Sequence, residues 1–161
     1  MVRFLLQSAC ILALVSCQSA KSNAPEYSTD LQKLERLVTL NPAPSDVFWQ
    51  VIEKGSRKGQ LGPSDWAIVA ILQYDESTMK KLQATVREID PLPDIFLEKD
   101  FIQVWFQEPV KNCFVQDSNS DYYIITVPAY PPELFAKSPL LHGYFFIVPR
   151  ENLVFLYLHT A

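Results

Sequence analysis

The fold of this chain is decided by two apolar segments near its end, GYFFIV at residues 143–148 and LVFLYLH at residues 153–159, with PREN at residues 149–152 between them. The segments are rich in aromatic and branched residues, and proline and asparagine suit turn positions, so the pattern predicts a β-hairpin. Nearly every position of both strands is apolar. Because successive side chains of a strand point to opposite faces, both faces need cover, from the chain itself or, on one face, from a partner.

Further strands are predicted upstream of this hairpin. Residues 112–116 and 122–127 form a second hairpin around the turn-forming sequence Asp117-Ser118-Asn119-Ser120-Asp121. Residues 66–72 are apolar throughout, which favours a strand covered on both faces, with a buried helix as the alternative. Residues 95–106 predict a short helix that runs into a strand.

Helices are expected mainly in the first half of the chain. Apolar spacing and capping residues predict helices over residues 30–40, 46–54 and 76–87, with Thr29, Ser45 and Asp75 as their N-caps. One helical turn is expected at residues 133–136. Helices before strands, hairpins afterwards and a single strand-to-helix step predict an α+β fold, in which a mostly antiparallel sheet of about four to five strands carries the N-terminal helices.

The first residues have the pattern of an export signal. Met1 to Arg3 make a short positive start, Phe4 to Leu14 form an apolar run too short to span a bilayer as a helix, and Leu14-Val15-Ser16-Cys17 follows. This order resembles the signal peptide and lipobox of bacterial lipoproteins. The resemblance covers about the first twenty residues. It implies that Cys17 receives a diacylglyceryl group on sulfur, that a type II signal peptidase cuts before it, and that its new amino group is acylated. An ordinary secretory leader is the alternative.

The resemblance also implies an organisation and an address. Residues 1–16 would be a lipoprotein signal peptide, residues 17–28 a lipid anchor and tether, and residues 29–161 a single α+β domain. Two or three acyl chains anchor a protein stably, whereas one binds only marginally. Gln18 stands where lipoproteins kept in the inner membrane commonly carry Asp. We therefore expect the outer membrane, on its periplasmic side, with the inner membrane and the cell surface as alternatives.

Composition excludes several classes of protein. The formal net charge is −4, and loss of Arg3 with the leader makes it more negative, so a nucleic-acid partner is disfavoured. Cys113 is the only thiol besides Cys17 in residues 17–161, which excludes a disulfide scaffold. His142 and His159 are too few for a typical zinc site, so no metal and no cofactor is assigned.

Cys113 and His142 are the only candidates for nucleophilic catalysis, since a thiolate forms near neutral pH when an imidazole lies beside it. Envelope cell-wall cysteine peptidases use such a pair, and His142-Gly143-Tyr144 resembles their histidine strand. Those enzymes place the cysteine at the start of a helix, within an Asp-Cys-Ser-Gly-like sequence. Asn112-Cys113-Phe114-Val115 resembles the start of a strand instead. A buried, structural cysteine is the favoured interpretation.

Two groups of carboxylates are interpreted as structural. Asp117, Asn119 and Asp121 match the first half of a calcium loop, but Tyr122 stands where glycine is needed and Pro128 where the closing glutamate is needed, so a plain turn is favoured. A second group of four carboxylates could do acid–base chemistry only if a cleft raised the pKa of one of them. Roles at turns and helix caps explain these residues better. Its members are Asp90, Asp94, Glu98 and Asp100.

Aromatic residues crowd the last third of the chain, beside proline-marked loops. Most must lie in the core, but aromatic surfaces are also typical of binding sites, because large rigid side chains give contact area at little entropic cost. The candidate binding residues are Tyr122, Tyr123, Tyr130, Phe135 and Tyr144.

The sequence therefore predicts a lipid-anchored, non-enzymatic binding module of the periplasm whose partner is a protein or another envelope component. An inhibitor or immunity-type protein fits this size and address by analogy of setting. A small envelope hydrolase that uses Cys113 and His142 is the alternative.

Overall fold

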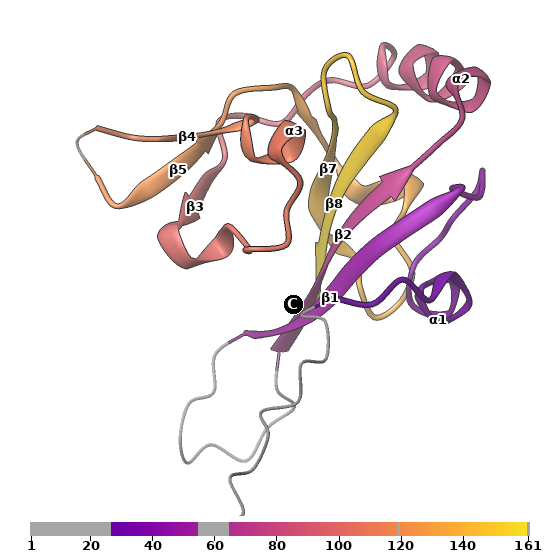
Figure 1. Cartoon of the computed structure of the whole chain (residues 1–161), viewed down its shortest axis with the longest axis horizontal. Coiled ribbons are helices and arrows are strands. Elements are labelled where there is room, and N and C mark those ends of the chain that lie inside the picture. Colours follow the sequence, from indigo (N-terminus) through magenta and orange to yellow (C-terminus); the bar gives the residue numbers. More distant parts are fainter. Residues whose placement is uncertain (1–26, 55–64, 119, 161) are drawn as a thin grey trace, which may run out of the picture.

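Two antiparallel sheets form the framework of the protein (Figure 1). The computed structural model describes residues 27–54, 65–118 and 120–160. The larger sheet has the strand order β1 (Asp46–Lys54), β2 (Asp65–Gln73), β8 (Leu153–His159), β7 (His142–Ile147), β6 (Ala129–Tyr130). The smaller has the order β3 (Phe96–Glu98), β5 (Tyr122–Ile125), β4 (Phe114–Gln116). A mixture of helices with mostly antiparallel strands is confirmed, but the strands divide between two sheets.

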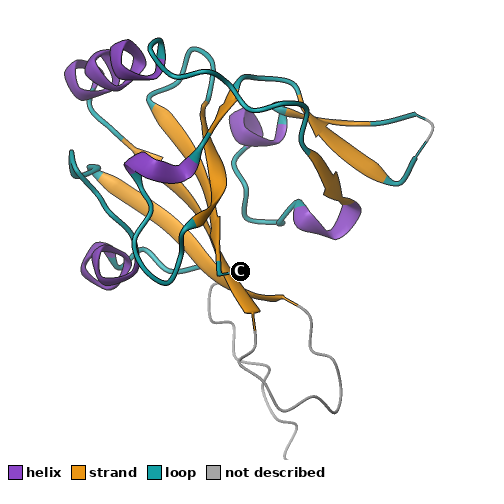
Figure 2. Ribbon diagram, turned by 180° about the vertical axis from the view of Figure 1, so that it is seen from behind, coloured by secondary structure: helices purple, strands orange, loops and turns teal. Residues whose placement is uncertain are grey.

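Short helices join and cover the strands. They are α1 (Leu31–Leu37), α2 (Glu76–Val86), α3 (Glu108–Lys111) and the 3-10 turns η1 (Lys99–Phe101) and η2 (Pro132–Leu134). In both views α1 and α2 lie on one side of the larger sheet, and the smaller sheet lies on the other side with α3 and η1 (Figures 1 and 2). The larger sheet is therefore the middle layer of three.

The C-terminal hairpin β7–β8 lies inside the larger sheet. Strand β8 pairs with β2 along one edge and with β7 along the other, and β7 pairs in turn with β6. The predicted hairpin and the strand predicted at residues 66–72 are both confirmed. Phe145, Phe146, Phe155 and Leu156 have no exposed surface, so both faces of the hairpin are covered by the chain itself.

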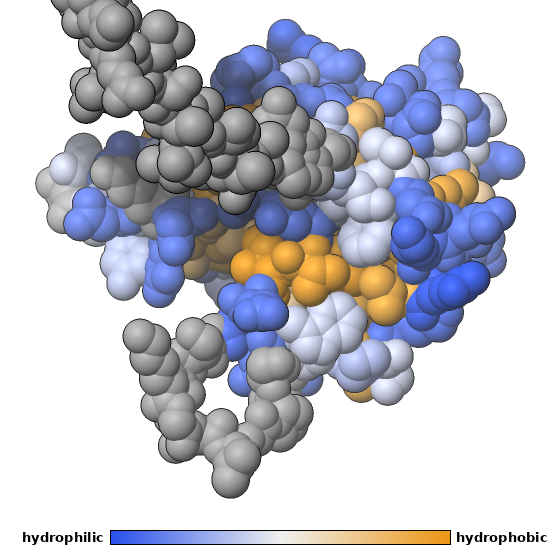
Figure 3. All heavy atoms as spheres, turned by 60° about the horizontal axis from the view of Figure 1, so that its bottom comes forward, coloured by the Kyte–Doolittle hydropathy of each residue, from blue (hydrophilic) through white to orange (hydrophobic). Residues whose placement is uncertain are grey.

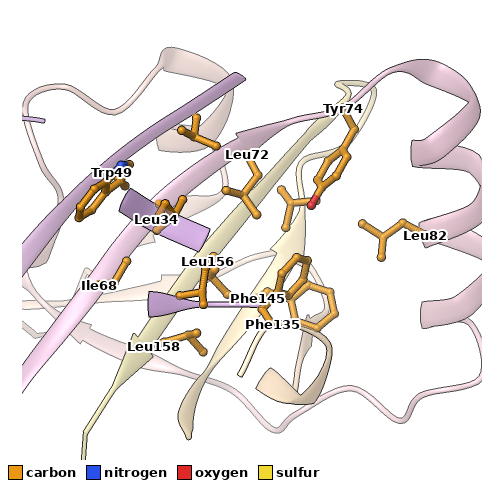
Figure 4. Packing of buried hydrophobic residues seen from close by; sticks show 14 of the residues in the cluster. Leu34, Trp49, Ile68, Leu72, Tyr74, Leu82, Phe135, Phe145, Leu156 and Leu158 are labelled. Carbon is orange, nitrogen blue, oxygen red and sulfur yellow. The ribbon is translucent and has the colours of Figure 1, made fainter. Parts of the chain in front are cut away.

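The helix-side core fills one face of the larger sheet. It includes Leu34 and Val38 around α1, Met79, Leu82 and Val86 of α2, Phe135 after η2, and Ile68, Phe145, Val154, Leu156 and Leu158 of the sheet. Figure 4 shows Phe135 beside Phe145 and Tyr74 between Leu72 and Leu82. The rings of Phe135 and Phe145 meet edge to face with centroids 4.9 Å apart. Leu34 and Val38 thus pack with residues of the larger sheet in one cluster.

The small-sheet core fills the opposite face. It includes Leu97, Phe106, Val110, Cys113, Phe114 and Ile125 from the smaller sheet and α3, and Val69, Tyr144, Phe146, Phe155 and Tyr157 from the larger sheet. Phe114 meets both Phe146 and Phe155 edge to face, at 5.6 and 5.5 Å between ring centroids. Trp105 donates a hydrogen bond from Nε1 to Gln50 Oε1 on β1, at 2.9 Å. Aromatic packing and this hydrogen bond hold the smaller sheet on the larger one.

Local signals at helix starts are largely confirmed. Asp75 caps α2 as predicted, and its carboxylate accepts hydrogen bonds from the Thr78 N–H and from the Ser77 and Thr78 hydroxyls. These bonds hold the pKa of Asp75 well below its usual range. For α1 the predicted cap is one residue early, because Asp30 rather than Thr29 accepts from the Lys33 N–H, at 3.0 Å.

The helix predicted over residues 46–54 is wrong, because this segment is β1. Its nine residues pair with β2 along their whole length. Val47 and Trp49 contribute to the helix-side core, whereas Phe48 and Ile52 pack against the small-sheet core. Phe48, Trp49, Val51 and Ile52 would also line one side of a helix, so pairing with a distant strand overrides the local pattern.

Two shorter elements also differ from expectation. Residues 95–106 were expected as a helix followed by a strand, and the order is reversed, because β3 precedes η1. Phe96 and Glu98 pair with β5, which makes the first part extended. The helical turn expected at residues 133–136 is η2, over residues 132–134.

The predicted anchor, Cys17, lies outside the described residues. The described chain begins at Tyr27, whose ring lies 5.6 Å from the Phe48 ring and 5.5 Å from the Trp105 ring. Ser28 forms a two-way backbone bridge with Trp49 on the outer edge of β1. The chain is thus attached to the domain at Tyr27 and Ser28, inside the range expected as tether. None of the described helices is long and apolar enough to cross a membrane.

Gly143 permits the close approach of β7 to β8. Its φ of +130° is one that residues with a side chain rarely adopt, and a Cβ there would overlap the carbonyl oxygen of Tyr157. The only described non-glycine residue with positive φ is Arg150, at 66° in the β7–β8 turn.

Gly143→Ala is expected to destabilise the domain by about 2 kcal/mol or more, since it adds both backbone strain and overlap. Arg150→Gly is the control, because glycine accepts the left-handed turn and should change stability by less than about 1 kcal/mol. Urea unfolding of both variants measures these costs. Equal losses in the two variants would contradict the special role of Gly143.

Candidate binding surface

Cys113 is a core residue. It is 2 % exposed, belongs to the small-sheet core, and its thiol donates to the Pro109 carbonyl at 3.4 Å. Burial raises the pKa of this thiol to about 11. A nucleophile requires a lowered pKa and access to substrate, so these properties favour the structural role predicted for Cys113.

His142 lies on β7, opposite His159 of β8. The two imidazole rings are 5.6 Å apart, and the His159 ring lies at the same distance from the Tyr157 ring. His142 is exposed, whereas Cys113 is buried. The structure pairs His142 with a second histidine across β7 and β8.

The segment 117–121 forms the hairpin turn between β4 and β5. Ser120 Oγ donates to Asp117 Oδ2 at 2.7 Å, and the Asp117 N–H donates to the Tyr122 carbonyl at 2.9 Å. Asn119 lies outside the described residues. No cluster of three or more potential metal ligands occurs within the described ranges. Asp90, Asp94, Glu98 and Asp100 are all exposed.

The five predicted aromatic binding residues do not form one surface. Tyr130 and Phe135 contact Phe145 on the helix side, and Phe135 is 3 % exposed. Tyr123 packs against the small-sheet core, and Tyr144 is 5 % exposed within it. Tyr122 alone is widely exposed, at 47 %, on the side of the smaller sheet that faces away from the core.

The outer face of the smaller sheet carries an exposed apolar row. Phe96 of β3 pairs with Ile124 of β5, which pairs in turn with Val115 of β4, so the three side chains lie side by side on one face. Phe96 is 58 % and Val115 54 % exposed. Tyr122 stands on the same face, next to Glu98. We call Phe96, Val115, Tyr122 and Ile124 the outer face.

Negative charge is concentrated in the segment that carries this face. Residues 90–127, which include the whole smaller sheet, contain seven Asp or Glu and two Lys, whereas the rest of the chain contains 11 acidic and 12 basic residues. This segment therefore accounts for all of the net negative charge of the protein. The acidic residues are Asp90, Asp94, Glu98, Asp100, Glu108, Asp117 and Asp121. Of these, Glu98, Asp100 and Asp121 line a common surface hollow with Tyr122 of the outer face. An apolar face with carboxylates beside it is a surface suited to a basic partner.

Sequence reasoning missed most of the outer face. Phe96, Val115 and Ile124 were not among the candidates, although the period-two pattern of residues 122–125 places Tyr122 and Ile124 on the same side of a strand. Comparison of the chain with known protein families, curated proteins and solved structures finds no match.

Cys113 is expected to react slowly with iodoacetamide in the folded protein. In a form without residues 1–17 it is the only cysteine, and its labelling rate should keep rising with pH towards the thiol pKa of about 11. The folded state holds the thiol neutral, so its contribution to stability is complete below about pH 9 and is lost between about pH 9 and pH 11. Cys113→Ala should remove that part of the pH dependence. Fast labelling at pH 7 that urea does not accelerate would contradict burial.

Proposed function

We propose that this protein is a lipid-anchored, non-enzymatic binding module of the bacterial envelope, held on the periplasmic side of the outer membrane. Its binding site is the outer face of the smaller sheet, and its partner is a protein. The observation that carries this proposal is the apolar row in which the exposed side chains of Phe96 and Val115 flank the half-buried Ile124.

The apolar row supports a protein partner because such a surface is costly to leave in water. Large apolar side chains gathered on one exposed sheet face are typical of interaction sites. On its other face the same sheet is buried against β7 and β8 through Leu97, Phe114 and Ile125. The sheet is therefore buried on one side, whereas Phe96 and Val115 on its outer side are more than half exposed.

The surrounding carboxylates indicate the charge of the partner. A basic protein surface would be attracted to residues 90–127 before contact, and like-charged proteins would be repelled. A nucleic acid would be repelled for the same reason. An inhibitor or immunity-type protein that blocks a basic enzyme or toxin in the periplasm is one kind of function that uses such a surface.

Anchoring is tested through Cys17. Cys17→Ala in the full chain is expected to abolish incorporation of labelled fatty acid and to leave either uncleaved precursor or protein missing from the outer-membrane fraction. The control is Cys10→Ala, which should be labelled and sorted like the wild type. Normal lipid labelling of Cys17→Ala would falsify the anchor.

The binding surface is tested by a photoreactive amino acid placed at position 115, in the cells that naturally produce the protein. We expect crosslinks to one basic envelope protein, weakened by Ile124→Ser and by high salt, because apolar contact and charge both contribute. The same amino acid at position 141 is the matched control, since Leu141 is equally exposed, at 54 %, but lies outside the smaller sheet. Equal crosslinking from both positions, or crosslinks that Ile124→Ser leaves unchanged, would contradict the proposal.

A further inference from the structure

A cleft of about 600 Å³ lies between the two sheets, beside the outer face. Its walls are the end of β1, with Ile52 to Lys54, and the segment from Ile95 through β3 and η1 to Gln103. Tyr144 of β7 and Tyr157 of β8 also line it, as a directly opposed pair with ring centroids 5.3 Å apart. Figure 3 views the molecule from the end where β1 finishes and shows apolar surface there with hydrophilic residues around it.

The hydroxyl of Tyr144 is buried and has no hydrogen-bond partner among the described residues. The side chain is only 5 % exposed. Burial, together with the neighbouring Tyr157, raises the pKa of Tyr144 well above its usual value, so the hydroxyl is a neutral donor and acceptor. Buried polar groups are normally paired, and an unpaired one in the wall of a cleft is a place where a ligand can add a hydrogen bond.

The charged residues of the cleft are mostly acidic. Glu53, Glu98 and Asp100 line it, together with the single described cation Lys54. None of these four takes part in the ion pairs found among the described residues, which join Lys33 to Asp30, Lys80 to Glu76 and Lys111 to Glu108. Among the described residues that line the cleft, three carboxylates therefore stand against one ammonium.

An ammonium group already occupies one aromatic surface of the cleft. Lys54 Nζ lies 5.1 Å from the centre of the Tyr157 ring, within the range of a cation–π interaction. The cleft also has apolar lining residues, namely Ile52, Ile95 and Phe101. Aromatic faces, carboxylates and an apolar wall together are what an aliphatic chain with a cationic end requires.

We propose that the cleft binds an ammonium or guanidinium group on an aliphatic stem. The stem packs against Ile52 and Phe101, and the cation takes the place of the Lys54 ammonium on the Tyr157 ring, close to the carboxylates. The assignment of this group to a lysine or arginine side chain of the partner rests on the proposed function, since Phe96 belongs to both the cleft and the outer face, and Glu98 of the cleft pairs with Tyr122 of that face. An anion held by Lys54 and Tyr144 is the competing assignment.

Three small probes with the same stem separate these assignments: pentylamine, pentanoate and pentanol. Each is titrated into the mature, lipidated protein in detergent micelles, with the ring resonances of Tyr144 and Tyr157 as the readout. We expect saturable shifts with pentylamine at millimolar concentration and none with pentanoate. Binding of pentanol as tight as that of pentylamine would show a merely apolar cleft and overturn the proposal. Absence of any shift with pentylamine would overturn it as well.

Lys54→Met gives the sharpest contrast, because it keeps the stem and removes the resident cation. It should tighten pentylamine binding about fivefold, whereas an anion site would lose pentanoate binding in the same variant. The double variant Glu98→Gln, Asp100→Asn should weaken pentylamine about fivefold. Glu151→Gln is the matched control, since Glu151 is exposed in the turn at the opposite end of β7 and β8. Unchanged urea midpoints show that the variants are folded.

The two proposals fail separately. Pentylamine binding without crosslinks from position 115 would leave a cation site in a protein whose partner surface is elsewhere. Crosslinks from position 115 without pentylamine binding would keep the proposed function and reject the cation site.

Discussion

The two-sided burial of the β7–β8 hairpin is the constraint on which the rest of the structure depends. Phe146 and Phe155 point to one face of the larger sheet, and Phe145 and Leu156 to the other, all without exposed surface. A single layer of helices could cover only one of these faces. The chain therefore has to supply a second cover, and residues 90–127 supply it as a small sheet with α3.

The smaller sheet, which covers this second face, also carries the proposed binding surface. A strand has two faces, so residues that place Leu97, Phe114 and Ile125 against the hairpin also direct Phe96, Val115 and Ile124 outward. Glu98, Asp100 and Asp121 of the same segment lie beside Tyr122 on that outer side, and Glu98 and Asp100 also line the cleft. The proposed binding surface and the proposed cation site are thus two sides of the unit that closes the core.

Local sequence patterns predicted both hairpins and α2. The signals for these elements, which are turn residues between apolar runs and the N-cap Asp75, lie within or next to the elements themselves. They failed at β1, where the spacing of Phe48, Trp49, Val51 and Ile52 fits a helix as well as a strand and only pairing with β2 decides. Strand register also disperses the aromatic candidates, since it sends Tyr130 and Tyr144 to opposite faces of the larger sheet. The register of the β7–β8 hairpin could also have been predicted from the position of its turn. Centring the turn at residues 149–152 pairs His142 with His159 and Tyr144 with Tyr157, as observed.

The most direct test of two-sided burial compares Phe146→Ala with Val154→Ala, which remove buried side chains from opposite faces of the hairpin. Urea unfolding of a form without residues 1–17 gives the free energy of unfolding of each variant. Phe146→Ala should cost about 3–5 kcal/mol and Val154→Ala about 1–3 kcal/mol. Each change removes buried apolar atoms and leaves a cavity, because both faces of the hairpin are covered by the chain. A wild-type midpoint for either variant would mean that one face of the hairpin is not part of the core, and would contradict the account.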